Sequence, residues 1–340
     1  MRYKLLGRSG LRVSELCLGT MTFGENWGWG ASKEVSQRIF ETFAEAGGNF
    51  IDTSNNYTDG TSEQFVGEFI AAERERFVVA TKYSLNTRKD DPNAGGNHRK
   101  NMVQALNASL KRLKVEYVDL LWLHMWDYMT PVEEVMRALD DVVRAGKVLY
   151  IGLSDTPAWV ASQANTTAEL RGWSRVVAIQ AAYSLATRDI ERDILPMSQA
   201  LDMAVAAWDV LDGGGLTGKY NASDNGEPKR MSKASAKTLT IAEELIRMGK
   251  EIGRSPAQIA INWVRQQPGR VVPIIGARSE AQMKDNLGCL EFELTGEQLQ
   301  QLNEATKIEM GFPQSFLASD HVHNLIFGET YSLVKNHRAL

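Results

Sequence analysis

The chain has 340 residues, of which 43% are hydrophobic and 24% are charged. This composition is typical of a globular protein that buries a sizeable core, either as two average domains or as one large α/β barrel. A formal net charge of −4 argues against a nucleic-acid-binding surface. The sequence contains no signal-peptide core and no apolar run of membrane-spanning length, so we expect a cytoplasmic protein. Its two cysteines, Cys17 and Cys289, lie far apart in apolar settings and are predicted to be reduced thiols.

The first part of the chain predicts a hairpin, a strand and a helix. Residues 3–5 and 11–13 are short apolar segments on either side of Gly-Arg-Ser-Gly, a pattern typical of a β-hairpin. Residues 15–19 predict a buried strand, and a loop rich in glycine and tryptophan follows. Ser32 then precedes apolar residues at helical spacing, which predicts a capped helix.

A unit of strand, loop and helix repeats along the chain. Counting from Leu16, we expect eight strands, each a continuous apolar run of the kind that is buried on both faces of a sheet. Eight such units without a linker predict a closed (β/α)8 barrel with an N-terminal β-hairpin and extra helices, over residues 1–340 as a single domain. An open doubly wound sheet is the alternative. The expected strands are 15–19, 49–52, 77–81, 117–123, 148–153, 176–180, 203–208 and 271–275, and the later expected helices are 62–73, 98–113, 131–145, 157–170, 190–201, 238–252, 255–266, 279–287 and one that Thr295 caps.

Three further segments are expected around a site at one end of the barrel. Residues 86–97 and 221–237 are polar and poor in helix signals, and we expect both to be mobile loops over the site. A C-terminal tail from about 308 to 340 either closes the pocket or packs along the barrel. Its apolar residues include Phe312, Phe316, Leu325 and Phe327.

Ionisable side chains follow three neighbouring strands. Asp52, Lys82 and His124 come at the carboxyl ends of the second, third and fourth expected strands, where barrel enzymes carry their active sites. Tyr57 lies in the second loop. Each residue alone has a structural explanation, as a helix cap, a solvated charge, a core histidine or a packed turn. Together at one rim they indicate a function, because burying charged groups costs several kcal/mol.

These four groups suit the delivery of a proton to an oxygen atom. A phenol is a weak acid, and a neighbouring ammonium is expected to lower its pKa while a carboxylate holds the ammonium in place. The imidazole could donate a hydrogen bond to a carbonyl oxygen. We expect no metal site, because the histidines are not at ligand spacing, and no Ser-His-Asp arrangement is apparent.

Two glycine-containing segments indicate phosphate binding. Residues 213–220 fit a dinucleotide fingerprint and nearly fit a P-loop, but no helix is expected to begin there, and Tyr220 replaces the Ser or Thr that a P-loop needs. A glycine loop after the seventh strand of a barrel still suits phosphate, since its bare amides can approach oxygens closely. Residues 275–286 bring a glycine, Arg278 and a helix N-terminus together, which favours a phosphate site after the eighth strand.

Nearly the whole chain resembles the aldo-keto reductases. This resemblance implies the (β/α)8 barrel and a catalytic tetrad of Asp52, Tyr57, Lys82 and His124. In that family the tyrosine is the general acid, the lysine and aspartate tune it, and the histidine orients the carbonyl. The resemblance rests on residues 18–21, 52–57, 61–67, 79–82, 109–113, 117–124, 146–147, 151–154, 180–184, 215–219 and 275–278.

The resemblance also implies NADP(H) as the cofactor. Arg278 is expected at the adenosine 2′-phosphate, Gln282 and Asn286 at the adenine end, and Tyr183 stacked on the nicotinamide ring. Ser154 and Gln180 are expected to bind the nicotinamide carboxamide. The other residues expected around the cofactor are Gly19, Thr20, Met21, Asp52, Asp155, Trp208, Asp209, Val210, Leu211, Gly215, Lys219, Gly276 and Ala277.

Two positions depart from the family's usual pattern. Asp155 follows Ser154 where Asn is usual, which is a mild change. Asp209 follows Trp208 where the family commonly has Ser, and it brings a carboxylate close to the expected pyrophosphate. Asp209 could repel phosphate, bind a ribose hydroxyl as acids do in NAD sites, or face away.

Aromatic and sulfur-containing side chains are expected above the nicotinamide. Trp27, Trp29, Met125, Trp126 and Tyr128 lie in loops over the strand ends and indicate an apolar or aromatic pocket, although each could equally pack the top of the barrel.

The predicted function is the NADPH-dependent reduction of aldehydes and ketones to alcohols. The expected partner is a small carbonyl substrate, with neither nucleic acid nor a membrane involved. Two alternatives remain open. One is an NADPH-binding regulatory subunit with little turnover, resembling the family's potassium-channel β-subunits, and the other is an alcohol dehydrogenase that works mainly in the oxidative direction.

Overall fold

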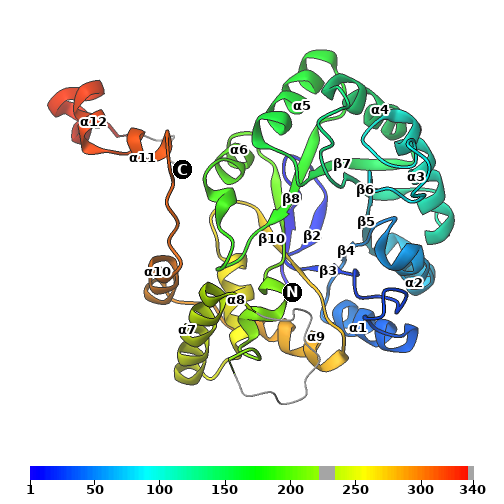
Figure 1. Ribbon diagram of the computed structural model, residues 1–340, viewed down its shortest axis with the longest axis horizontal. Helices are drawn as coiled ribbons and strands as arrows, with labels where there is room; N and C mark the ends of the chain where they lie inside the picture. Colours follow the sequence, from blue (N-terminus) through cyan, green and yellow to red (C-terminus); the bar gives the residue numbers. More distant parts are fainter. Residues whose placement is uncertain (222–233, 336–340) are drawn as a thin grey trace.

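A closed parallel barrel forms the centre of the molecule, as the sequence predicts (Figure 1). The computed structural model describes residues 1–221 and 234–335. Eight strands pair in the order β10–β3–β4–β5–β6–β7–β8–β9, so the open-sheet alternative is excluded. Their bounds are β3 (Cys17–Gly19), β4 (Phe50–Asp52), β5 (Val78–Tyr83), β6 (Val118–Leu123), β7 (Val148–Ser154), β8 (Val176–Ala182), β9 (Ala204–Trp208) and β10 (Val271–Ile275).

A two-stranded hairpin closes the N-terminal end of the barrel. It consists of β1 (Tyr3–Leu5) and β2 (Arg12–Ser14), which pair antiparallel. Leu6 and Val13 are fully buried and join the apolar cluster inside the barrel. Gly7 has a φ of +56°, and a Cβ there would lie 2.0 Å from the carbonyl oxygen of Val177, near the start of β8. The turn of the hairpin therefore needs glycine both for its backbone conformation and for its close approach to the barrel.

Side chains fill the barrel from inside, so it is not a pore. Phe50, Leu120 and Trp122 are fully buried in the interior cluster. The indole of Trp122 takes the space beside Gly152 on β7, where a Cβ would lie 2.3 Å from the ring. A second and larger apolar cluster lies between the strands and the surrounding helices. The filled interior leaves the carboxyl ends of the strands as the place for a site.

Helices surround the barrel at nearly the positions predicted. Pro131 is an exception, because it is the N-cap of its helix and not the first helical residue. No helix of the described residues is long and apolar enough to cross a bilayer. The helices are α1 (Lys33–Glu45), α2 (Thr61–Ile70), α3 (Arg99–Leu113), α4 (Val132–Arg144), α5 (Ala158–Arg171), α6 (Ile194–Ala200), α7 (Ala236–Ile252), α8 (Pro256–Arg265), α9 (Glu280–Leu287), α10 (Gly296–Ala305), α11 (Gln314–Leu317) and α12 (Asp320–Phe327).

The C-terminal tail does not cover the barrel end. Figure 1 shows α11 and α12 standing away from the barrel, beyond α6. Within the described residues, no side chain of the tail lines the cavity at the strand ends. Of the two alternatives for the tail, closure of the pocket finds no support among the described residues. The chain leaves α10 in an extended segment and carries the tail outward.

The two predicted loops have different outcomes. Residues 86–97 contain turns and no helix, and the loop is closed by hydrogen bonds from Thr87 N to Ala94 O and from Gly96 N to Ser84 O. Most of the second loop, residues 222–233, lies outside the described residues.

Candidate active site

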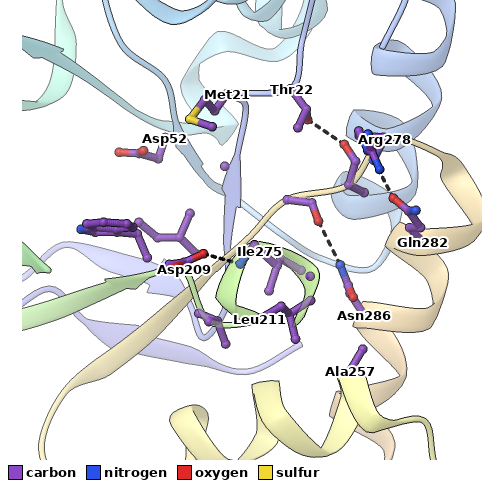
Figure 2. A pocket seen from close by; sticks show the side chains of 18 of the residues that line it. Met21, Thr22, Asp52, Asp209, Leu211, Ala257, Ile275, Arg278, Gln282 and Asn286 are labelled. Carbon is purple, nitrogen blue, oxygen red and sulfur yellow. Dashed lines mark hydrogen bonds between the residues drawn. The ribbon is translucent and has the colours of Figure 1, made fainter. Parts of the chain in front are cut away.

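A cavity of about 930 Å³ lies at the carboxyl ends of the strands. It brings together side chains from the loops after most of the strands and from the start of α9 (Figure 2). Most of the predicted site residues line it. They are Gly19, Met21, Trp27, Trp29, Asp52, Tyr57, His124, Met125, Ser154, Asp155, Gln180, Trp208, Asp209, Val210, Leu211, Lys219, Gly276, Ala277, Arg278, Gln282 and Asn286.

Lys82 lies fully buried beneath the cavity and connects Asp52 to Tyr57. Its ammonium donates hydrogen bonds to Asp52 Oδ2 at 2.5 Å, to the carbonyl oxygen of Thr53 at 2.9 Å and to Tyr57 Oη at 2.9 Å. The other oxygen of Asp52 accepts a hydrogen bond from Gln180 Nε2 at 2.9 Å. An ammonium has three donors and no acceptor, so all the hydrogens of Lys82 are used. The hydroxyl proton of Tyr57 therefore points away from Lys82 and is available to the cavity.

The pKa of Tyr57 is raised above its usual value, which corrects the predicted lowering. Burial raises this pKa most, and the attraction of the Lys82 ammonium opposes burial without outweighing it. The charges of Asp52 and Asp155 raise the pKa further. At Lys82, burial alone would lower the pKa, but the neighbouring Asp52 carboxylate and the Tyr57 oxygen raise it overall. The pair is thus a neutral phenol beside a charged ammonium, which is the form that a proton donor needs.

His124 lines the cavity beside Tyr57 as a neutral imidazole. Burial, assisted by the charge of Lys82, lowers its pKa to about 2. The rings of Tyr57 and His124 meet edge to face with centroids 6.0 Å apart. His124 Nδ1 lies 3.2 Å from Ser54 Oγ, and this hydroxyl lies 2.8 Å from Asn56 Oδ1. The sequence motif included Ser54 and Asn56, but nothing in the sequence indicated their contact with the imidazole.

Trp208 takes the position in the cavity wall that was predicted for Tyr183. Tyr183 is buried behind the wall, where its hydroxyl donates to Glu191 Oε1 at 2.7 Å and its ring packs against Trp263 on α8. Trp208 lines the cavity and is 37% exposed. Its indole Nε1 donates a hydrogen bond to Asp155 Oδ1 at 3.1 Å. Stacking of Tyr183 on a ligand in this cavity is therefore excluded by its position.

Four other predicted residues do not line the cavity. Thr20 is fully buried, with its hydroxyl bonded to the carbonyl oxygen of Asp52 and to Ser62. Gly215 is buried in the short 3₁₀ segment Asp212–Thr217. Trp126 packs against the outer apolar cluster. Tyr128 is 73% exposed outside the cavity.

The start of α9 forms the side of the cavity across from Asp52 (Figure 2). Figure 2 shows Arg278, Gln282 and Asn286 on this side of the pocket. Ser279 is the N-cap of α9 and accepts a hydrogen bond from Gln282 N at 3.3 Å. Gln282 Oε1 accepts from the backbone N–H of Arg278 at 2.9 Å, and Asn286 Nδ2 donates to the carbonyl oxygen of Gly276 at 3.1 Å. These bonds hold a cationic side chain at a helix N-terminus, an arrangement that attracts anions.

Asp209 belongs to the cavity wall, and its side chain turns toward Gly213. Its backbone has a φ of +56°, a left-handed conformation that aspartate tolerates better than most residues. Its Oδ1 accepts a hydrogen bond from Gly213 N at 2.7 Å, which Figure 2 marks beside the label of Asp209. The carboxylate therefore stabilises the glycine turn from inside the cavity.

Several cavity residues were not singled out from the sequence. Some lie in loops next to predicted residues, where position after a strand was the available signal. Thr22 is one of them, and its hydroxyl donates to the carbonyl oxygen of Ala277 at 2.7 Å, linking the first loop to the last (Figure 2). The others include Asn56, Leu85, Ser255, Pro256, Ala257 and Asp285. Ser255, Pro256 and Ala257 lie at the start of α8 and Asp285 lies in α9, where the signal of position after a strand does not apply. Residues of the predicted glycine segment 213–220 also line the cavity, namely Gly213, Gly214, Thr217 and Gly218.

Comparison with known proteins gives one consistent assignment. The model of the Aldo/keto reductase family matches residues 15–307. A norsolorinic acid reductase from Aspergillus flavus is 39% identical over 324 residues, which cover 92% of this chain and 83% of that protein. A putative aryl-alcohol dehydrogenase from Saccharomyces cerevisiae is 37% identical over 339 residues, covering 94% and 90%. An aryl-alcohol dehydrogenase [NADP(+)] from Phanerodontia chrysosporium is 36% identical over 345 residues, covering 93% and 89%.

Proposed function

Because the chain belongs to the aldo/keto reductase family, we propose that it reduces aldehydes or ketones to alcohols with NADPH. The observation that carries this proposal is the arrangement of Lys82 and Tyr57. Lys82 donates to the phenol oxygen, so the proton of Tyr57 is directed into the cavity. The direction of this proton suits its transfer to a carbonyl oxygen.

The residues around the cavity fit a nicotinamide dinucleotide. At one end, the N-terminus of α9 and Arg278 suit phosphate groups. At the other end, Ser154 and Gln180 offer hydroxyl and amide groups for a carboxamide, and Trp208 offers an aromatic face. When bound, the reduced nicotinamide supplies a hydride to the carbonyl carbon.

Tyr57 then donates its proton to the carbonyl oxygen. Lys82 stabilises the negative charge that remains on the phenol oxygen, and Asp52 holds Lys82 in position through the 2.5 Å hydrogen bond. His124 lies on the cavity side of Tyr57 and orients the carbonyl oxygen. General acid catalysis of this kind contributes roughly 10²- to 10⁴-fold in rate.

We infer a preference for NADPH and for aromatic carbonyl compounds. Arg278 in the cavity wall supports the binding of a 2′-phosphate, and the relative from Phanerodontia chrysosporium is named as an NADP(+) enzyme. Trp27, Trp29 and Met125 give the substrate end an apolar wall, with the two indole rings 5.7 Å apart. The name aryl-alcohol dehydrogenase, carried by several relatives, supports an aromatic substrate.

A panel of aromatic and aliphatic aldehydes and ketones, assayed with NADPH and with NADH, tests the proposal. Tyr57→Phe should lower turnover by about 10²-fold or more while NADPH still quenches protein fluorescence as in the wild type. Tyr83→Phe is the matched control, since Tyr83 is a buried tyrosine outside the cavity wall that bonds to Asn97 O. Binding of NADPH with no turnover of any carbonyl compound by the wild type would exclude a reductase.

The oxidative direction is the second candidate, because several relatives are named dehydrogenases. The same residues would act in reverse, with the phenolate of Tyr57 accepting the proton of an alcohol. Because the pKa of Tyr57 is raised, its phenolate becomes populated only at high pH. Oxidation of aryl alcohols with NADP+ should therefore become faster as the pH rises, and a rate that is flat or falling would argue against it.

A further inference from the structure

The C-terminal arm, which we define as residues 308–335, presents apolar side chains to solvent. The arm contains α11, α12 and the 3₁₀ segment η6 (Gly328–Leu333), and it lies outside the part of the chain that the family model matches. Its rings pack on one another, with Phe312 against Phe316 and Tyr331 against both His323 and Phe327. The exposed apolar residues of the arm are Phe312, Phe316, Leu317, Leu325, Ile326, Phe327, Tyr331, Leu333 and Val334.

The exposed apolar area of the arm is large enough for a stable interface. Leu325 is 69% exposed and Leu333 is 80% exposed. With about 150–250 Å² for each aromatic side chain and about 100 Å² for each aliphatic one, the arm exposes on the order of 700–900 Å². A stable interface buries about 800 Å² on each partner, whereas the largest apolar patch of a typical monomer is roughly 300–600 Å².

Hydrogen bonds at the base of the arm direct it away from its own cavity. The guanidinium of Arg192 donates through Nε and Nη2 to the carbonyl oxygen of Glu309, at 3.0 and 2.9 Å. The side chain of Gln314 donates back to the carbonyl oxygen of Arg192 at 2.6 Å. These bonds fix residues 309–314 to the loop after β8, and Figure 1 shows the remainder of the arm projecting outward from there. Within residues 1–221 and 234–335, no segment covers these apolar side chains, which leaves another molecule as the candidate cover.

A second exposed apolar patch lies beside the cavity mouth. We define the rim patch as Met125, Tyr128, Met129 and Trp159, which are between 44% and 88% exposed. Three of these residues follow β6, and Trp159 lies in the first turn of α5, after β7. Because β6 and β7 pair in parallel, their following loops are neighbours at the same end of the barrel. Met125 also lines the cavity, so the rim patch borders the site itself.

We propose that the arm of one molecule docks on the rim patch of a second copy of this chain, and that two such contacts form a symmetric dimer. Each copy carries both an arm and a rim patch, so a two-fold arrangement covers both apolar surfaces of both chains. By the same reckoning the rim patch exposes on the order of 300–500 Å². Two reciprocal contacts, each covering a rim patch and an equal area of the arm, therefore bury about the area of a standard interface. An exchanged arm would lie next to the cavity mouth of its partner.

The mass of the full-length chain in solution tests the proposal. Light scattering after size exclusion should give twice the chain mass of 37.8 kDa for the wild type. Leu325→Lys combined with Leu333→Lys in the arm, and separately Trp159→Glu on the rim, should each convert the dimer to a monomer that still binds NADPH. Leu170→Glu is the matched control, since Leu170 lies at the other end of α5 and is 81% exposed. This variant should remain dimeric.

Cross-linking identifies which molecule receives the arm. One copy carries Leu325→Cys, and a second copy with a longer tag carries Met129→Cys. A bifunctional maleimide should join the two copies when they are mixed, because Cys17 and Cys289 are buried and stay unlabelled. A wild type that is monomeric at all concentrations would overturn the proposal. So would a dimer that survives both the arm and the rim substitutions, or a chain carrying both cysteines that cross-links only within itself.

Discussion

His124 is a neutral, buried imidazole, and its protonation makes the free energy of unfolding depend on pH. Its folded-state pKa is about 2, whereas the unfolded chain binds this proton near pH 6.5. The folded pKa is the lower one, so His124 adds stability above about pH 6.5, and this stability is lost as the pH falls. The slope is at most about 1.4 kcal/mol for each pH unit.

We therefore expect acid to destabilise the wild type more than His124→Gln. Between about pH 7 and about pH 5, the wild type should lose up to roughly 2 kcal/mol more of its free energy of unfolding. Urea unfolding at these two pH values measures the difference. Equal losses in the two proteins would mean that His124 binds its proton in the folded state.

Ser54 determines which nitrogen of His124 carries the hydrogen. A hydroxyl has one hydrogen to donate. Ser54 Oγ donates to Asn56 Oδ1 at 2.8 Å, and it also lies 3.2 Å from His124 Nδ1 and 3.4 Å from Asn55 Oδ1. If Ser54 donates to Asn56, then His124 Nδ1 carries the proton and Nε2 can only accept. If Ser54 donates to His124, then Nε2 carries the proton and can donate to a carbonyl oxygen.

A hydrogen bond from His124 to a carbonyl oxygen needs the second arrangement, in which the Ser54 hydroxyl turns from Asn56 to His124. We therefore expect Ser54→Ala to impair carbonyl reduction. We expect kcat/KM for an aldehyde to fall by about 2- to 12-fold, the equivalent of one neutral hydrogen bond, with NADPH affinity unchanged. Nitrogen-15 NMR of labelled histidine should show Nε2 protonated in the wild type and a mixture of tautomers in Ser54→Ala. A wild-type spectrum with Nδ1 protonated would contradict the assigned role of His124 as a donor.

At the scale of elements, we expect the turn after β9 to affect both the local backbone conformation and the affinity for NADPH. Asp209 accepts from Gly213 N in a left-handed conformation, so a serine there would weaken the hydrogen bond and lose the conformational preference. Asparagine keeps both and removes the charge. If the carboxylate repels phosphate, Asp209→Asn should tighten NADPH binding by about 3- to 10-fold. This corresponds to about 1 kcal/mol, the size expected for two charges that are partly screened by solvent.

Fluorescence titration with NADPH measures this effect, and Asp212→Asn is its control. Asp212 belongs to the same turn and also has a positive φ of +49°, but its carboxylate accepts from Thr238 Oγ1 at 2.6 Å and does not line the cavity. Its substitution should leave NADPH affinity unchanged. Weaker binding by Asp209→Asn would instead favour a hydrogen bond from the cofactor to this carboxylate.

The barrel and the meeting of Asp52, Tyr57, Lys82 and His124 at one end of it were predictable from the sequence, while one aromatic contact was not. Apolar runs of strand length revealed all eight strands, and each run ended where the chain turns toward the site. Gln180 and Tyr183 are three residues apart along an extended segment, so their side chains point to opposite faces of the sheet. Trp208 pairs with Ala182 in register and therefore shares the face of Gln180. The sequence contains the alternation, but the register that selects Trp208 exists only in the folded sheet.

The direction of the pKa shift of Tyr57 and the position of the C-terminal arm could not be predicted from the sequence, for a different reason. A sequence shows that Lys82 and Tyr57 come together, but the sign of the pKa shift depends on how completely the phenol is buried. The apolar residues of the tail were visible, and their pattern is the same whether they cover a cavity or stand in solvent. The hydrogen bonds of Arg192 at the base of the arm make that distinction.

At the scale of the whole molecule, a buried ion pair joins the N-terminal hairpin to the outer helices. Glu15 lies between β2 and β3, and its Oε2 accepts from Arg265 Nη1 of α8 at 2.7 Å, with both side chains less than one tenth exposed. Glu15 also accepts from the backbone N–H of Arg2, and Arg265 donates to the carbonyl oxygen of Phe292. The pair therefore connects four segments at the end of the barrel opposite the cavity.

Removing one partner of this ion pair should lower the free energy of unfolding strongly, whereas removing both partners should lower it much less. Glu15→Gln leaves a buried guanidinium without its counter-charge, and we expect the free energy of unfolding to fall by about 3–5 kcal/mol. Glu15→Gln combined with Arg265→Met removes the charge as well, so the loss should be smaller than in the single variant. Urea unfolding of the two single variants and the double variant measures this difference. NADPH affinity should remain unchanged in all folded variants. The ion pair stabilises the closed end of the barrel, whereas the cofactor would bind at the open end. A loss of NADPH affinity in parallel with the loss of stability would mean that the two ends of the barrel are energetically coupled.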